Sequence, residues 1–307
     1  MLVAQTELLN EKARGLDLRA PEDVVRLLAE AQIEAARAAL SAADAIAGAA
    51  ELASRSLASG GKLAYAAAGS SGLMALADAL ELPGTYGIPR DRIKILLAGG
   101  TESLINLPGA PEDDADQARR DIADAQLGGS DCLIALSASG STPYAIAALE
   151  AAKERGTATI AIANNANAPI HALADVAILL ETPPEMVAGS TRMGAATAQK
   201  IALNMISTLV AINLGHVHDG YMVNVHADNI KLRHRAARIV AAVSDCDEDA
   251  AHGFIERSGG SVKAAILMAS GAANAAAASE LLERSGQKLR PALSILEGER
   301  KLPITDT

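Results

Sequence analysis

The stretch LAYAAAGSSGLMALADALE, Leu63 to Glu81, decides how the rest of the chain is interpreted. A short apolar run ends at Gly69-Ser70-Ser71-Gly72, and an Ala- and Leu-rich helical pattern follows at once. A strand, a hydroxyl-bearing loop and a helix in that order can bind an anion, because a helix N-terminus presents unpaired N–H groups and a partial positive charge. Strand-to-helix turns in any α/β domain also favour Gly and Ser, so this loop alone fits ordinary turn chemistry equally well.

Composition narrows the class of protein. Half of the 307 residues are apolar but only 2% are aromatic, so the core must be built from small aliphatic side chains. The net charge of -10 and the lack of Lys/Arg blocks argue against nucleic acid or an anionic membrane as partner. Two distant cysteines, Cys132 and Cys246, fit a reducing compartment. Without a signal-peptide pattern or a run near the ~18 apolar residues of a membrane span, we expect a soluble, cytoplasmic protein.

Apolar runs alternate with helical patterns, which indicates an α/β fold with a parallel sheet covered on both faces. We expect strands at 63–68, 94–98, 131–137, 158–163 and 176–180. We expect helices at 21–58, 69–81, 114–127, 143–155, 191–214 and 228–243, and three short ones between 249 and 286. The expected domains are an N-terminal segment with helices packing on the core (1–58), the α/β domain (59–246) and a small helical domain (247–307).

A second hydroxyl-rich loop, Ser137 to Thr142, follows the third expected strand and opens a helix, as the first loop does. Ligands of open parallel sheets bind at the carboxyl ends of the strands, where two such loops can converge. Helix N-capping accounts for one or two of these hydroxyls but not for the whole set, so we favour phosphate binding. Neither loop carries the Gly-Lys-Ser/Thr of nucleotide hydrolases or the glycine pattern of dinucleotide folds.

Two carboxylates are candidates for acid–base chemistry. Glu81 is expected to end the first helix just before Leu82-Pro83-Gly84, and Glu112 lies in a Pro-rich irregular loop after the second strand. Carboxyls in such places can act as general acid and base if their environments separate their pKa values. From the spacing alone, both are better interpreted as solvated residues than as catalysts. The spacing of His216, His218 and His226 fits no metal motif, so no metal site is expected.

Several motifs, taken together, resemble one family. The most specific are Pro184-Glu185, GSTRM at 189–193, TAQK at 197–200 and LNMIST at 203–208. The others are Thr6-Glu7, GSSG at 69–72, Asp78-Ala79-x-Glu81-x-Pro83, Ala98-Gly99-Gly100, Glu112-Asp113, ASGSTPY at 138–144 and Asn229-x-Lys231-Leu232. Over nearly its full length the chain resembles the sugar-isomerase (SIS) phosphosugar-binding fold, and more narrowly the N-acetylmuramic acid 6-phosphate etherases.

The resemblance implies a three-layer α/β sandwich with a small C-terminal helical domain, and a lyase that cleaves the lactyl ether of a sugar 6-phosphate. Glu81 would be the acid that assists departure of lactate, and Glu112 the base. No metal or organic cofactor is implied, and the family is dimeric. The candidate substrate- and phosphate-binding residues are Ser70, Ser71, Ser137, Ser139, Ser141, Thr142, Glu185, Ser190 and Arg192. A solvated loop carboxylate is an equally good interpretation of Glu185, and Arg192 fits a ligand or inter-subunit role.

The chain departs from the family at three cationic positions. Leu73, Ser141 and Gly194 stand where the family has Arg, Arg and Lys. Charge-assisted hydrogen bonds are roughly twice as strong as neutral ones, so their loss should weaken anion binding. Glu81 and Glu112 are both present, which favours retained elimination chemistry with an altered substrate preference. Another aldose-phosphate lyase or isomerase, and a phosphosugar sensor without catalysis, remain as alternatives.

Overall fold

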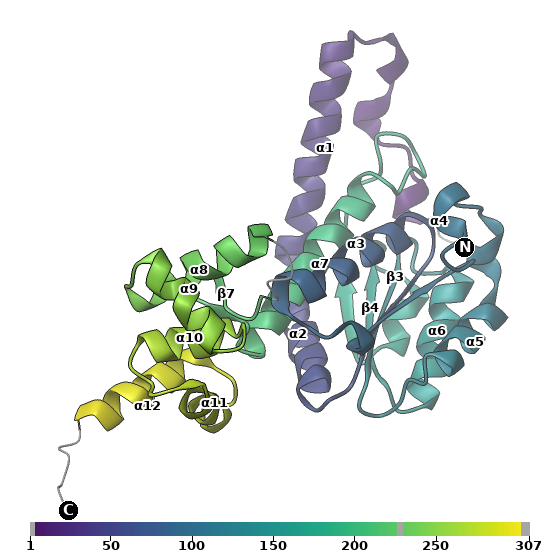
Figure 1. Cartoon of the computed structure of the whole chain (residues 1–307). Helices are drawn as coiled ribbons and strands as arrows, with labels where there is room; N and C mark the ends of the chain where they lie inside the picture. Colours follow the sequence, from purple (N-terminus) through teal and green to yellow (C-terminus); the bar gives the residue numbers. More distant parts are fainter. Residues whose placement is uncertain (1–3, 226–229, 302–307) are drawn as a thin grey trace, which may run out of the picture. The chain divides into compact units, whose positions relative to one another are not determined.

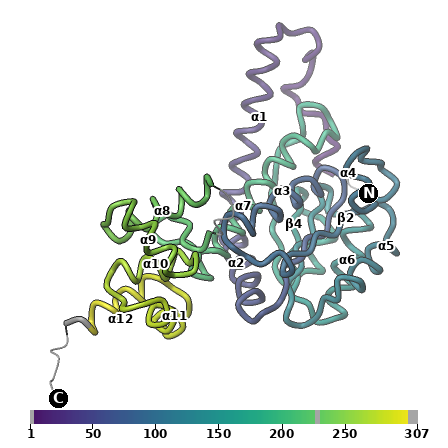
Figure 2. Tube along the Cα trace, in the orientation of Figure 1, coloured from purple at the N-terminus to yellow at the C-terminus, as the bar shows by residue number. Residues whose placement is uncertain are grey.

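The computed structural model describes residues 4–225 and 230–301. The chain divides into two compact units, shown in Figures 1 and 2. Unit 1 comprises Met1–Leu80 and Arg90–Val210, and unit 2 comprises Glu81–Pro89 and Ala211–Thr307. His226 and Asn229, named above among the histidines and the family motifs, lie outside the described residues.

Unit 1 is built on a five-stranded sheet with the strand order β2-β1-β3-β4-β5, and every neighbouring pair is parallel. This confirms the expected parallel sheet. The central strands β1 and β3 are buried along their whole length, which explains their continuous apolar sequences. The strands are β1 Leu63–Ala67, β2 Ile93–Leu97, β3 Cys132–Ser137, β4 Ala158–Ala163 and β5 Val176–Leu179.

Helices cover both faces of the sheet, as expected for three layers. Alternate residues of a strand point to opposite faces. Ala64 and Ala66 of β1 pack in one cluster with residues of helices α5 (Ala115–Asp124) and α6 (Pro143–Glu154). Between them, Tyr65 points to the opposite face, where its hydroxyl donates to Asp78 of α3. The remaining helices of this unit are α1 Pro21–Ser41, α2 Ala43–Ala58 and α4 Ser103–Asn106, together with most of α3 Gly69–Tyr86 and α7 Gly194–Asn213, whose last residues belong to unit 2.

Several helix boundaries differ from expectation. The region 21–58 is two helices, because Ala42 leaves helical geometry between α1 and α2. Three short 3-10 helices lie between residues 5 and 18, where no helix was expected, and α7 begins at Gly194 instead of residue 191. Helix α3 does not end at Glu81: it continues through Pro83 to Tyr86, and Gly87 N–H donates to the Pro83 carbonyl at 3.0 Å. The 3-10 helices are η1 Gln5–Glu7, η2 Glu11–Ala13, η3 Leu16–Leu18, η4 Arg90–Arg92, η5 Ala110–Asp113 and η6 Pro169–Leu173.

Helix α7 is long and has an apolar composition. It is long and apolar enough to cross a membrane by length and sequence alone. In the structure, 56% of that stretch is buried, which is the pattern of a core helix. Its Ser207 and Asn204 side chains donate to Asp78 of α3, so its inner face packs inside unit 1.

Unit 2 is helical apart from a short antiparallel hairpin. Residues of its helices form one apolar cluster that includes Ala236 and Val240 of α8. The expected domain boundary at residue 246 assigned α8 to the α/β domain, whereas its packing groups it with the C-terminal helices. Three short helices were expected after α8, and the structure has a fourth, α12. The elements are β6 Val217–His218, β7 Tyr221–Met222, α8 Ile230–Ser244, α9 Glu248–Arg257, α10 Val262–Ala269, α11 Ala275–Arg284 and α12 Leu289–Lys301.

A buried carboxylate, Asp78, links three elements of unit 1. It is 5% exposed and accepts hydrogen bonds from Tyr65 Oη at 3.0 Å, Asn204 Nδ2 at 2.7 Å and Ser207 Oγ at 2.9 Å. Burial raises the pKa of this carboxyl. Because a buried donor without an acceptor costs more than a hydrogen bond contributes, the network should tolerate the loss of its acceptor poorly.

Replacing Asp78 with Ala leaves those donors without their acceptor, so we expect the free energy of unfolding to fall by about 2–4 kcal/mol. Urea denaturation followed by circular dichroism measures this change. Glu150→Ala, at an exposed position on α6, is the matched control and should change stability by less than about 0.5 kcal/mol. Equal denaturation midpoints for Asp78→Ala and wild type would contradict the proposed importance of the network.

Candidate active site

The two hydroxyl-rich loops meet at one edge of the sheet. Strands β1 and β3 are neighbours and parallel, so the loops that follow them leave the sheet side by side. Between the loops lies a small cavity of about 170 Å³. Its lining residues are Thr6, Glu7, Ala68, Ser70, Ser71, Glu112, Ser137, Ala138, Ser139, Thr142, Gly189 and Thr191.

The first loop places the N-terminus of α3 at this cavity. Gly69 adopts a left-handed conformation (φ +53°), which a residue with a side chain rarely adopts. A Cβ at Gly69 would lie 2.7 Å from Oε1 of Glu112, so the glycine also makes room for that carboxylate. Ser70 and Ser71 follow in the first turn of the helix, where unpaired N–H groups are available to an anion.

The second loop is held by hydrogen bonds among its own side chains. Ser137 Oγ lies 2.8 Å from Thr142 Oγ1 and 3.3 Å from Ser139 Oγ, and it accepts from Gly140 N–H at 2.9 Å. Gly140 again has a positive φ of 72°. These bonds fix the hydroxyls before any ligand arrives, which lowers the entropic cost of binding.

Glu112 reaches the cavity from the 3-10 helix η5. Its neighbour Asp114 caps α5 by accepting from Gln117 N–H at 2.7 Å, which fixes the end of the loop. Partial burial, together with the negative charge of Asp113, raises the pKa of the Glu112 carboxyl. A carboxylate with a raised pKa is a stronger base, because burial disfavours its charged form.

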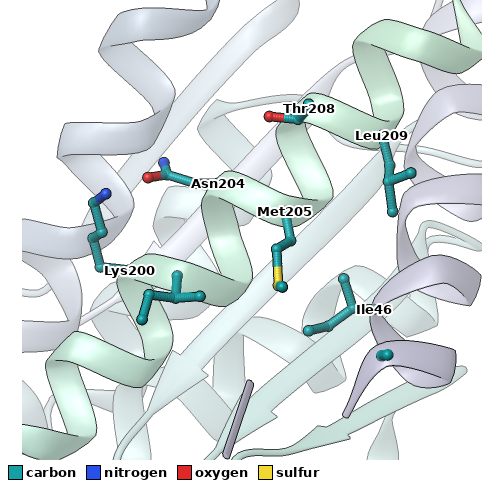
Figure 3. A pocket seen from close by; sticks show the side chains of 8 residues that line it. Ile46, Lys200, Asn204, Met205, Thr208 and Leu209 are labelled. Atoms are coloured by element: carbon teal, nitrogen blue, oxygen red, sulfur yellow. The ribbon is translucent and has the colours of Figure 1, made fainter. Parts of the chain in front are cut away.

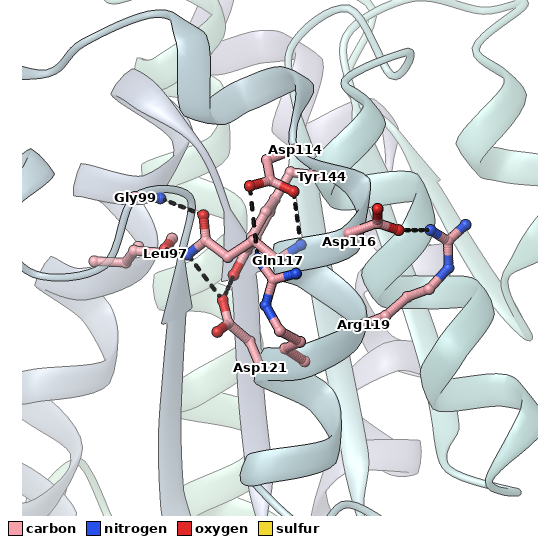
Figure 4. A network of polar contacts seen from close by, with 9 residues as sticks. Leu97, Gly99, Asp114, Asp116, Gln117, Arg119, Asp121 and Tyr144 are labelled. Carbon is pink, nitrogen blue, oxygen red and sulfur yellow. Dashed lines mark hydrogen bonds and ion pairs between the residues drawn. The ribbon is translucent and has the colours of Figure 1, made fainter.

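A polar network, drawn in Figure 4, holds α5 against the sheet and so positions this loop. Gln117 Nε2 donates to the Leu97 carbonyl at 3.2 Å, and its Oε1 accepts from Gly99 N–H at 2.9 Å. Asp121 Oδ2 accepts from Tyr144 Oη on α6 at 2.6 Å and from the same Gln117 amide at 3.2 Å. The loop that carries Glu112 is therefore anchored on the side of β2 and on the side of α5.

Six of the candidate residues share the cavity, and five do not line it. Glu185, expected at the substrate, is 4% exposed, and its two carboxylate oxygens accept from Gly194 and Ala195 N–H, each at 2.9 Å. It caps the N-terminus of α7, a role the surrounding loop sequence did not indicate. Those within the cavity are Ser70, Ser71, Glu112, Ser137, Ser139 and Thr142, and those outside its lining are Glu81, Ser141, Glu185, Ser190 and Arg192.

The position of Glu81 differs most from expectation. The residue is exposed and lies on a helix that continues past it. At about 1.5 Å per residue, it is about 18 Å along α3 from Gly69 at the cavity. The expectation that the helix ends at Glu81 is therefore wrong, and the residue does not line the cavity of its own chain.

The lining also includes residues that were not among the candidates. Thr6 and Glu7 come from η1, and Gly189 and Thr191 come from the GSTRM loop, in which Ser190 and Arg192 were the expected residues. Thr6-Glu7 appears among the family motifs, but nothing in its local pattern indicates chemistry. In the part of the chain that the structure describes, no Lys, Arg or His lines this cavity, so the donors seen there are hydroxyls and backbone N–H groups.

Other cavities of unit 1 differ in character. A groove of about 460 Å³ is lined by α2 and α7 (Figure 3). Its apolar residues include Ile46 and Met205, and its polar residues are Lys200, Asn204 and Thr208. A third cavity of about 580 Å³ is lined by Gln5, Ser139, Ser141 and residues 165–169. Within residues 4–225 and 230–301, no group of three or more His, Cys, Asp or Glu side chains is arranged to hold a metal ion.

Comparison with known proteins agrees with this fold and these motifs. Residues 29–164 match the model of the SIS domain. N-acetylmuramic acid 6-phosphate etherase of Deinococcus radiodurans is 39% identical over 96% of this chain and 96% of its own length, and that of Pectobacterium atrosepticum is 42% identical over 72% of this chain and 73% of its own. A putative phosphosugar isomerase from Bacteroides fragilis is similar in structure (TM-score 0.50, 21% identity, 66% of this chain and 97% of that one). With a SIS domain and full-length similarity of this degree, the chain belongs to the N-acetylmuramic acid 6-phosphate etherase family.

Proposed function

We propose that the protein cleaves the lactyl ether of N-acetylmuramic acid 6-phosphate, giving N-acetylglucosamine 6-phosphate and lactate. The observation that carries the proposal is the cavity in which Glu112 adjoins two phosphate-type loops, in a chain whose relatives bear the name of this activity. We further propose that the protein works in the cytoplasm, in the recycling of cell-wall amino sugars.

The two hydroxyl-rich loops offer a binding site for the phosphate of the substrate. Ser70 and Ser71 begin α3, and Thr142 directly precedes α6, so two helix N-termini and several hydroxyls face the cavity. Such groups bind an anion without a cationic side chain. A phosphate held there would orient the sugar chain toward Glu112, whose carboxylate contacts Gly69.

In the proposed reaction Glu112 removes the proton at C2 of the open-chain sugar. The C1 aldehyde acidifies this proton, because the electron pair of the C2–H bond can be delocalised onto the aldehyde oxygen as an enolate. The pair then forms the C2=C3 double bond as the C3–O bond breaks, and the lactate oxygen takes a proton from an acid, because an alkoxide is a poor leaving group. Addition of water to the double bond restores a hydroxyl at C3.

The acid assigned by family resemblance is Glu81, which does not line the cavity of its own chain. We propose that the protein is a homodimer in which Glu81 acts in the site of the partner subunit. Helix α1 offers a face for such pairing, since the side chains of Val25, Ile33 and Leu40 are 64%, 56% and 70% exposed. They recur at nearly two-turn intervals, so they form one apolar stripe that a second copy of the chain could cover.

Wild-type protein should release lactate from N-acetylmuramic acid 6-phosphate, and Glu112→Gln should lower kcat by about 10²–10⁴-fold, the usual contribution of a general base. A coupled lactate dehydrogenase assay measures both. Glu102→Gln, an exposed carboxylate in the same connection, is the matched control and should retain wild-type rates. No lactate from the wild type at high enzyme concentration contradicts the activity, and binding of sugar phosphates without turnover would favour a sensor.

The pH profile should depend on Asp113. Burial and the negative charge of Asp113 raise the pKa of Glu112, and a base must be deprotonated, so kcat/KM should fall as pH drops through that raised pKa. Asp113→Asn removes the repulsion and lowers the pKa, so the acidic limb should move to lower pH. Asp124→Asn, an exposed residue at the end of α5, is the control. An unmoved limb in Asp113→Asn argues against Glu112 as the group that titrates.

Mixing inactive variants tests the shared site. In a dimer of one Glu81→Gln subunit and one Glu112→Gln subunit, one site would hold both carboxyls and the other neither. After unfolding and refolding an equal mixture, random pairing should restore about one quarter of wild-type activity. Each variant refolded alone is the control. Two inactive variants that stay inactive together, although mixed dimers form, would show that each site belongs to one chain.

A further inference from the structure

Glu7 is a second carboxylate at the polar cavity and has no assigned role. It ends the 3-10 helix η1 and lines the cavity together with Glu112. Its side chain contacts the GSTRM loop: Oε2 would lie 3.1 Å from a Cβ at Gly189, a residue that lines the same cavity and has φ +74°. The carboxylate therefore approaches the cavity where a glycine makes room for it.

The segment that carries Glu7 is fixed to unit 1 by hydrogen bonds to three loops. Thr6 is 2% exposed; its N–H donates to Asn165 Oδ1 at 3.4 Å, and its carbonyl accepts from Gly189 N–H at 3.1 Å. On either side, Gln5 Nε2 donates to the Thr182 carbonyl at 3.0 Å, and Asn10 Nδ2 donates to the Pro184 carbonyl at 2.8 Å. The residues around Glu7 thus form a wall of the cavity that hydrogen bonds hold in place, and the fold therefore sets the position of Glu7.

The carboxylate itself takes no part in holding this wall. Within the described residues, the interactions of the segment come from Gln5, Thr6 and Asn10, and Glu7 forms no side-chain hydrogen bond or ion pair. By contrast, Ser137, Ser139 and Thr142 already bond to one another. An acceptor with free lone pairs at the edge of a polar cavity is available to a ligand's donor groups.

Electrostatics restricts which part of a ligand Glu7 can bind. A carboxylate repels a phosphate group, and among the described residues no cationic side chain lines the cavity to offset that repulsion. The phosphate must therefore lie at the hydroxyls and helix N-termini, away from Glu7. What Glu7 can accept are hydrogen bonds from the uncharged donors of a sugar phosphate, its hydroxyl and acetamido N–H groups, and such bonds to an ionised acceptor are the stronger kind.

We propose that Glu7 is a substrate-binding residue that accepts hydrogen bonds from the sugar portion of the substrate and so selects for sugar phosphates over inorganic phosphate. The inference rests on the proposed function for the identity of the sugar. It assigns no proton transfer to Glu7, so its loss should act on KM more than on kcat.

Glu7→Ala should raise KM for N-acetylmuramic acid 6-phosphate by about tenfold or more, with kcat within about threefold of wild type. Glu7→Gln keeps one acceptor oxygen, so its KM should lie between that of wild type and that of Glu7→Ala. Glu11→Gln, an exposed carboxylate in the next 3-10 helix, is the matched control and should leave KM unchanged. Because the Glu7 side chain makes no hydrogen bond or ion pair with the described residues, the thermal midpoint of Glu7→Ala should stay at the wild-type value.

Calorimetric titration of the full-length chain with two probes separates this inference from the proposed activity. Glu7→Ala should bind N-acetylglucosamine 6-phosphate more weakly, and inorganic phosphate as tightly as wild type or more tightly, since a negative charge is removed. Equal weakening of both probes, no change for the sugar phosphate, or no binding of either by wild type overturns the inference. Normal titration results without lactate release overturn only the proposed activity.

Discussion

The parallel pairing of β1 with β3 is the constraint on which the candidate site depends. The two strands run in register from Leu63 opposite Cys132 to Ala67 opposite Leu136, at the centre of the sheet. Their carboxyl ends therefore coincide, and the two loops that follow open helices at the same edge. If another strand lay between β1 and β3, the hydroxyls of the two loops would lie too far apart to share one cavity. The alanines of β1, Ala64 and Ala66, let helices α5 and α6 pack closely against one face of the sheet.

Much of this arrangement could be predicted from the sequence. Continuous apolar strands bounded by Gly and Ser are a local signal, and they predicted the five strands to within about one residue of their observed ends. The loops were predictable for the same reason, because their hydroxyls lie next to the strand ends in sequence. The break between α1 and α2 at Ala42 has no such signal, since Ala is the strongest helix former and tertiary packing decides where the chain bends.

The errors concern residues whose partners are distant in the sequence or in the fold. Pro83 normally marks a helix end, and this led to the wrong boundary at Glu81; α3 continues because a single missing N–H can be tolerated when the following turn is bonded. Glu185 looked like a loop carboxylate because its partners are backbone N–H groups of α7, which no side-chain pattern reveals. The sequence motif that contains Thr6 does not predict its place at the cavity, because its contacts are with the distant residues Asn165 and Gly189.

The cavity draws its lining from almost the whole of unit 1, from Thr6 near the start of the chain to Thr191 just before α7. This has a consequence for the order of assembly. During synthesis the phosphate loops can form once β1 and β3 have paired. The wall made by residues 5–10, however, lacks the partners of its long-range hydrogen bonds until residues 165–189 have left the ribosome. Such pairing of early with late segments raises contact order and slows folding. The nascent chain therefore carries an open, incompletely walled site until most of it has been made.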